Sequence, residues 1–169
     1  MKKLIFLTIL LASWMPVYSQ QQAGDFQLQA QASYFSNSFA GQTFSSGSIY
    51  VNASRFFTDN IEVGVSPFFN FGDQTTVNLA FFGNYSFLLD NAMLVPYGGV
   101  QVMFYNLGSD PDFSQTGFGL KAGLRYFVTE NVNIDVGPNI VFLSAPSGFN
   151  EGSTLFQFTA GLGYIFGSR

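Results

Sequence analysis

The feature that most constrains this chain is a period-two alternation of apolar and polar residues, which recurs along the chain after its N-terminal segment. In residues 26–34, for example, large apolar residues and alanines alternate with glutamines and a serine. Successive side chains of a strand point to opposite faces, so this pattern predicts a strand with one apolar and one polar face. No stretch shows the spacing of an amphipathic helix.

Eight runs of this kind can be recognised, each bounded by turn-forming residues. They cover residues 26–34, 49–57, 61–70, 76–87, 94–105, 117–126, 132–140 and 156–166. A tilted strand of about ten residues crosses the apolar core of a bilayer. Short connections at 58–60, 88–92 and 129–131 alternate with longer polar ones at 36–47, 106–114 and 143–153, and 72–75 is a short exception. Short turns at one end and longer loops at the other are typical of outer-membrane barrels.

The composition favours a barrel whose polar face lies inside. Charged residues make up 9% of the chain and aromatic residues 18%, whereas charged residues are roughly 25% of soluble domains. The apolar face of the runs is bulky, and a chain of 169 residues has no second layer to cover it. The polar face is rich in Gly, Ser, Asn, Gln and Ala, which suits the narrow interior of an eight-stranded barrel. We therefore predict an all-β protein, an eight-stranded antiparallel up-and-down transmembrane β-barrel.

The N-terminal residues predict export. Lys2 and Lys3 precede an apolar stretch at 4–12, and Val17 and Ser19 are small enough for the −3 and −1 positions of signal peptidase,. This stretch is far shorter than the roughly 20 residues of a transmembrane helix. We expect a cleaved signal peptide at 1–19 and a single barrel domain at 20–169. The chain has no cysteine, which excludes disulfides and a lipid-modified N-terminal cysteine,.

Two hairpins repeat one pattern with a difference of one residue. Their sequences are RFFTDNIEVGVSP, at 55–67, and RYFVTENVNIDVGP, at 125–138. If Glu130 centres the second turn, Arg125 faces Asp135 across the strand pair, on the polar face. In the first copy the arginine is one residue nearer its Asn, so Arg55 falls on the apolar face. There it can extend to lipid headgroups.

The polar face therefore carries charges of both signs. They are Glu62, Lys121, Arg125 and Asp135. We expect these side chains to neutralise one another as a structural ion network in the lumen, with Lys121 opposite Asn139. Outside the runs, Phe39, Phe44, Phe113 and Phe149 either mark a contact surface or cover the barrel mouth, and the sequence leaves both readings open.

Aromatic residues gather toward both ends of the runs. Those near the short turns are Phe57, Phe87, Tyr126, Tyr164 and Phe166, and those near the longer connections are Tyr34, Phe71, Phe104, Phe118 and Phe156. Two such bands predict aromatic girdles at the two membrane surfaces.

The end of the chain, FQFTAGLGYIF at 156–166, carries a resemblance. Its alternating residues resemble the C-terminal assembly signal of outer-membrane proteins. These residues are Phe158, Ala160, Leu162, Tyr164 and Phe166. The tail 167–169 departs from members that stop at the aromatic residue. Together with the signal peptide and the PYGGV strand at Pro96, the mature chain resembles the porin-like small outer-membrane β-barrel family of Gram-negative bacteria, typified by the OmpA transmembrane domain and OmpX.

The resemblance implies an integral protein of the cell outer membrane, with a structural or surface-interaction role and a largely filled polar lumen. Its implied partners are outer-membrane lipid or lipopolysaccharide and, during biogenesis, the barrel-assembly machinery; a ligand of the extracellular loops stays open. One alternative is a narrow channel for small or hydrophobic compounds, of the OmpW-like kind. A second is a soluble ligand-binding β-barrel.

Several chemistries are unsupported. The chain has no histidine and no cysteine, so catalytic triads and His or Cys metal sites are excluded,. The GFGLKA segment at 117–122 fits a dinucleotide-binding glycine pattern, but strand alternation runs through it where a helix should begin. We expect no enzyme activity, no cofactor and no metal. After removal of the two N-terminal lysines, four basic residues remain against ten acidic ones, which argues against nucleic acid as a partner,.

Overall fold

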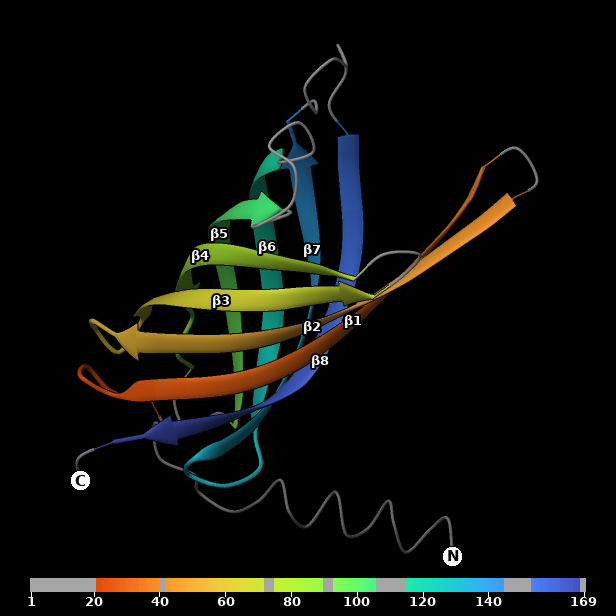
Figure 1. Ribbon diagram of the computed structural model, residues 1–169. Coiled ribbons are helices and arrows are strands. Elements are labelled where there is room, and N and C mark those ends of the chain that lie inside the picture. The colour runs from red at the N-terminus through yellow and green to blue at the C-terminus, as the bar shows by residue number, and fades with distance from the viewer. Residues whose placement is uncertain are drawn as a thin grey trace, which may run out of the picture.

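The computed structural model describes residues 21–39, 42–71, 75–89, 93–105, 115–144 and 153–167. Its strands are β1 (Phe26–Phe39), β2 (Gln42–Phe56), β3 (Ile61–Phe71), β4 (Thr76–Ser86), β5 (Leu94–Tyr105), β6 (Gln115–Phe127), β7 (Val132–Leu143) and β8 (Ser153–Phe166). Each strand is antiparallel to the next, and β1 also pairs with β8, so the sheet closes into a barrel (Figure 1). The predicted eight-stranded up-and-down barrel is confirmed. Among the described residues, no helix is long and apolar enough to cross a membrane.

The two faces of the barrel wall follow the alternation of the sequence. In β7, for example, the buried residues Asn133, Asp135 and Asn139 alternate with the exposed residues Ile134 and Ile140. Most bulky apolar side chains therefore face outward, and the charged and amide side chains of the wall face the interior.

The register between β6 and β7 is the predicted one. Arg125 is paired with Asp135, and Lys121 with Asn139. This hairpin and the β2–β3 hairpin turn at the same end of the barrel, which we call the turn side; the opposite end is the loop side. The register fixes which side chains share the interior, because a slip of one residue would turn each of them outward.

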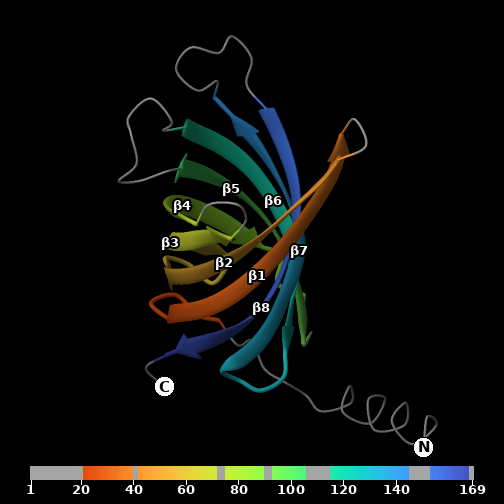
Figure 2. The ribbon, with the colours of Figure 1, turned by 45° about the vertical axis from the view of Figure 1, so that its right-hand side comes forward.

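The prediction of a loop over residues 36–47 is wrong. β1 and β2 stay paired from Tyr34 and Gly47 out to Phe39 and Gln42. Pairing between β1 and β8 ends at Tyr34 and Phe158, and Figure 2 shows the far end of the β1–β2 hairpin leaning away from the other strands. Hydrogen bonds between strands need no apolar face, whereas the prediction followed only the alternation of side chains.

The interior also contains two apolar clusters, which the prediction of a small polar inner face misses. The turn-side cluster consists of Phe56, Val95, Phe127 and Ile165. The loop-side cluster consists of Tyr50, Phe68, Ala80, Met103, Tyr105 and Val141. Charged and amide side chains lie between the two. The alternation could have revealed these inward residues. Phe56, for example, lies two residues from the inward-facing Ser54 and therefore points to the same face.

Candidate functional site

The inner polar cluster is built around the guanidinium group of Arg125, whose side chain is only 1% exposed. Its Nη2 donates a hydrogen bond to Oε2 of Glu62 at 2.9 Å, and its Nη1 donates to Oε1 of Gln21 at 2.9 Å. Its Nε lies 3.5 Å from Oδ2 of Asp135, which makes a second ion pair. Because Arg125 lies on β6 and Glu62 on β3, the first ion pair joins strands that are not neighbours in the sheet.

Both carboxylates are held by further polar groups. Glu62 accepts hydrogen bonds from Oγ of Ser54 at 2.5 Å and Nδ2 of Asn84 at 3.0 Å. Oδ1 of Asp135 accepts hydrogen bonds from the hydroxyl of Tyr97 at 2.8 Å and Nε2 of Gln31 at 2.9 Å. Charges taken out of water need such partners, because an unpaired buried charge is strongly destabilising. The cluster therefore has the contacts of a structural brace, with neither carboxylate left as a free base.

The fourth predicted member, Lys121, lies apart from the other three. Its Nζ stands 4.7 Å from the ring centre of Phe82 and 5.9 Å from that of Tyr97. Within the described part of the chain, Lys121 is in no ion pair. The structure thus brings Glu62, Arg125 and Asp135 together and places Lys121 against aromatic faces.

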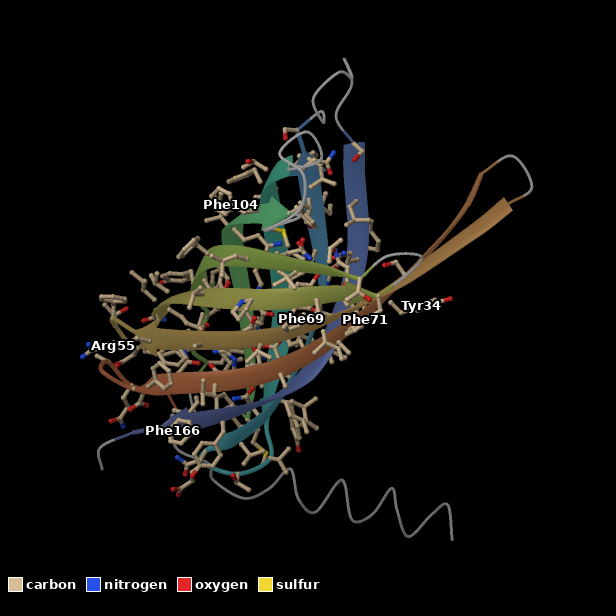
Figure 3. All side chains as sticks on the ribbon, in the orientation of Figure 1. Tyr34, Arg55, Phe69, Phe71, Phe104 and Phe166 are labelled. Atoms are coloured by element: carbon tan, nitrogen blue, oxygen red, sulfur yellow. The ribbon has the colours of Figure 1, made fainter. Side chains whose placement is uncertain are left out.

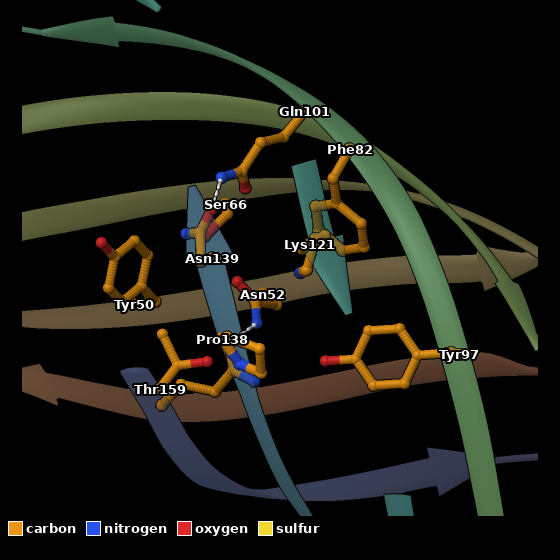
Figure 4. A pocket seen from close by; sticks show the side chains of 11 residues that line it. Tyr50, Asn52, Ser66, Phe82, Tyr97, Gln101, Lys121, Pro138, Asn139 and Thr159 are labelled. Carbon is orange, nitrogen blue, oxygen red and sulfur yellow. Dashed lines mark hydrogen bonds between the residues drawn. The ribbon is translucent and has the colours of Figure 1, made fainter. Parts of the chain in front are cut away.

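The space beside Lys121 is small. Figure 4 shows it lined by polar and aromatic side chains, with Nε2 of Gln101 donating a hydrogen bond to Oδ1 of Asn139 at 2.7 Å. This cavity has a volume of about 10 Å³. A cavity needs roughly 10–15 Å³ to hold one water molecule, so no larger ligand fits without rearrangement.

The GFGLKA segment lies within β6, so the strand context argues against a dinucleotide site. Two glycines of β6 make room for the inner side chains. A Cβ atom on Gly119 would lie 2.6 Å from the side chain of Gln101, and one on Gly123 would lie 2.6 Å from the ring of Tyr97. Such approaches are far inside van der Waals contact, so a larger residue would displace these side chains.

A segment before β1 closes onto the turn side, and the sequence analysis does not predict it. Gln21 is fully buried; besides its bond with Arg125, its Nε2 donates to the backbone oxygen of Asp59 at 2.7 Å. The backbone N–H groups of Ala23 and Gly24 donate to Oδ1 of Asp59 and to the oxygen of Phe56, each at 2.8 Å. Gly24 has a φ of 98°, which glycine adopts without strain,. Residues 21–25 show no alternation, so the strand pattern could not reveal this segment.

The outer face is apolar and aromatic. The residues predicted to form two aromatic bands are all exposed, from Phe104 at 36% to Tyr34 at 67%. Arg55 also faces outward, as its parity predicts, and Figure 3 shows it at the turn side with Phe166 on the same end of the barrel.

The five residues predicted as an assembly signal lie on the outer face of β8. All five stand opposite residues of β1 in the seam that closes the barrel: Phe158 faces Tyr34, Ala160 faces Ala32, Leu162 faces Ala30, Tyr164 faces Leu28 and Phe166 faces Phe26. Their part in assembly stays a prediction.

Other predictions fall outside the described residues. Residues 1–20, with the expected signal peptide, belong to this group, as do Phe113 and Phe149. Phe39 and Phe44 belong to paired strands instead of a loop. Among the described residues, no group of three or more His, Cys, Asp or Glu side chains is arranged to hold a metal ion.

Comparison with known proteins finds likeness in structure alone. No family model and no curated protein matches the chain. Neisserial surface protein A matches with a TM-score of 0.68 and 18% identity, over 85% of this chain and 99% of that one. The N-terminal β-barrel domain of Pseudomonas aeruginosa OprF matches with a TM-score of 0.58 and 23% identity, over 86% and 100%. Outer membrane protein OprG of the same organism matches with a TM-score of 0.56 and 15% identity, over 89% and 100%.

The chain has the fold of the small outer-membrane β-barrels. At these identities the likeness concerns the fold, and it agrees with the resemblance drawn from the C-terminal strand. Each matched chain is covered almost completely, so the likeness extends over the whole barrel.

Proposed function

We propose that the protein is an integral outer-membrane β-barrel with a structural or surface-interaction role and a closed polar lumen. The observation that carries the proposal is the reversed polarity of the wall. Large apolar side chains such as Phe81 and Leu162 are 51% and 61% exposed, while Arg125 and Glu62 are each 1% exposed inside the barrel. In a soluble ligand-binding barrel the apolar side chains would line the interior instead.

Three features support a closed lumen. The turn-side and loop-side apolar clusters fill the interior at its two ends. Between the two clusters, Arg125 and Glu62 form an ion pair, with 2.9 Å between Nη2 and Oε2. The cavity beside Lys121 holds only about 10 Å³. A conducting pathway would need these side chains to move apart.

The proposed partners of the barrel follow from its apolar outer face. The outer wall meets membrane lipid, including lipopolysaccharide, and the outer face of β8 serves the barrel-assembly machinery through its alternating apolar residues. Export would use the signal peptide at 1–19, so the mature chain would begin at Gln20. No catalytic step is proposed, because both inner carboxylates are engaged by cationic and neutral donors.

The membrane assignment is tested on protein expressed in a Gram-negative host. We expect outer-membrane fractionation, a mature N-terminus at Gln20 and a faster SDS-gel band before heating than after it. Monodisperse protein in detergent-free buffer would contradict the assignment.

Single-channel recording in planar bilayers tests the closed lumen. We expect no unitary conductance for the wild-type barrel. Steady unitary currents would favour the alternative, a narrow channel for small or hydrophobic compounds.

A further inference from the structure

Arg55 is the one charged residue of the eight strands that faces outward. The others, Glu62, Lys121, Arg125 and Asp135, face the interior. Arg55 is exposed and is paired in the sheet with Phe26 and Val63, two apolar neighbours. Within the described part of the chain it is in no ion pair. A guanidinium group has five N–H donors, and none of the described residues accepts a hydrogen bond from that of Arg55,.

An apolar groove of about 370 Å³ lies on the same wall. Besides Gln29 and Gly163, it is lined by Leu28, Ala30, Val51, Val132, Leu162 and Tyr164. Ala30 is paired with Val51 on one side and Leu162 on the other, so a small methyl group stands between two larger side chains. This leaves a hollow that is open to the outside of the barrel.

The register places the groove directly beyond Arg55. Arg55, Phe26 and Phe166 form one row across β2, β1 and β8. The next outward row contains Leu28 and Tyr164, where the groove begins. Successive outward rows are about 7 Å apart, because each strand residue rises roughly 3.3 Å. The cation thus lies at the turn-side end of the groove, in a row of aromatic residues.

We infer that this site binds one glycerophospholipid of the turn-side leaflet, with its phosphate on Arg55 and one acyl chain in the groove. The inference rests on the proposed membrane location. Guanidinium groups bind phosphate oxygens through two parallel hydrogen bonds, and an acyl chain matches the apolar lining. A second copy of the chain fits less well, because the outer faces of its strands carry no carboxylate: Glu62 and Asp135 face inward.

The test is native mass spectrometry of the full-length protein in detergent, titrated with phosphatidylglycerol and, separately, with a diacylglycerol of the same chains. We expect one tightly retained phosphatidylglycerol and no retained diacylglycerol. Arg55→Gln should weaken retention about tenfold, as loss of a charge-assisted contact predicts. Ala30→Phe, which fills the groove, should also weaken it. Ala122→Phe, at an exposed outer position of β6, is the matched control and should bind as the wild type does.

Equal retention by the wild type and Arg55→Gln would overturn the inference, as would equal binding of diacylglycerol or a dimer in place of the lipid adduct. Each variant is first checked for the unheated fast band, so that misfolding is not read as loss of binding. A folded, membrane-located barrel that retains no lipid would overturn this inference and leave the proposed function standing. Protein that is not membrane-located would remove both.

Discussion

The β2–β3 and β6–β7 hairpins share one turn and place an arginine on opposite faces of the barrel. In the first, Oγ1 of Thr58 accepts hydrogen bonds from the backbone N–H groups of Asn60 at 3.3 Å and Ile61 at 3.0 Å. In the second, Oγ1 of Thr129 accepts the same two bonds from Asn131 and Val132, also at 3.3 and 3.0 Å. The two threonines therefore accept equivalent hydrogen bonds in the two turns.

The asparagines of both turns also act alike. Nδ2 of Asn60 donates to the backbone oxygen of Ser86 at 2.8 Å, and Nδ2 of Asn131 donates to that of Ile165 at 2.7 Å. Each asparagine thus ties its turn to the end of the neighbouring strand. The local sequence that shapes the turn is conserved between the two hairpins, so the difference must arise before it.

The difference is one residue, Val128, between the arginine and the threonine. It moves Arg125 onto the inner face, where two carboxylates receive it, while Arg55 lies on the outer face. Successive residues of a strand point to opposite faces, so the number of residues between a charge and a fixed turn decides whether the charge faces the interior or the outside. An arginine therefore forms buried ion pairs in the β6–β7 hairpin and is exposed on the outer face in the β2–β3 hairpin.

Deletion of Val128 should have the largest effect. The deletion would give Arg125 the same spacing from its turn as Arg55. Either the turn must then change its conformation, or every residue of β6 shifts by one position relative to β7. We expect the fast unheated SDS band to disappear. Deletion of Asp112, which lies between β5 and β6 in the sequence, is the control and should keep the band. A fully folded Val128 deletion would mean that parity does not fix the arginine.

Arg125→Ala should follow in size. It leaves Glu62 and Asp135 buried without their cation, and removal of one partner of a buried ion pair costs about 3–5 kcal/mol. Urea unfolding in lipid vesicles measures the loss. A change under about 1 kcal/mol, typical of exposed pairs, would show that water reaches the cluster freely.

Thr58→Val and Thr129→Val should have smaller and nearly equal effects. Each removes a hydroxyl that accepts two backbone hydrogen bonds, and a lost hydrogen bond of this kind costs about 1 kcal/mol. The same unfolding assay applies to both. Clearly unequal values would mean that the two turns are not equivalent.

Arg55→Ala should change stability least, by less than about 1 kcal/mol, because its charge is exposed and in no ion pair of the described structure,. A loss as large as that of Arg125→Ala would contradict its placement on the outer face.

Parity explains both what the sequence could predict and what it could not. Alternation and turn residues predict the eight strands, the facing of Arg125 and Asp135, and the outward direction of Arg55. They give the face of a residue but not its partner across the lumen, which depends on how the closed sheet is staggered. The contact of Arg125 with Glu62 and the separation of Lys121 therefore needed the structure. The burial of Gln21 needed it too, because no strand pattern includes that residue.

The inward aromatic residues were missed for another reason. Phe56 and Phe127 have the parity of polar neighbours, but a chain rich in aromatic residues invites the assumption that all of them face outward. Strand length was missed at 36–47 because serine, asparagine and threonine can pair in a ladder without any apolar face,.

A double-mutant cycle by urea unfolding in lipid vesicles tests the central claim most directly. The cycle pairs Asp135→Ala with Arg125→Ala, and a second cycle pairs Asp135→Ala with Arg55→Ala. Residues in one ion-pair network couple by about 0.5–3 kcal/mol, whereas distant residues are additive within about 0.5 kcal/mol. We predict coupling of Asp135 with Arg125, so that the double variant recovers part of the loss, and none with Arg55. Coupling of Asp135 with Arg55 and not with Arg125 would contradict this claim, because it would mean that Arg55 faces the interior and Arg125 faces outward.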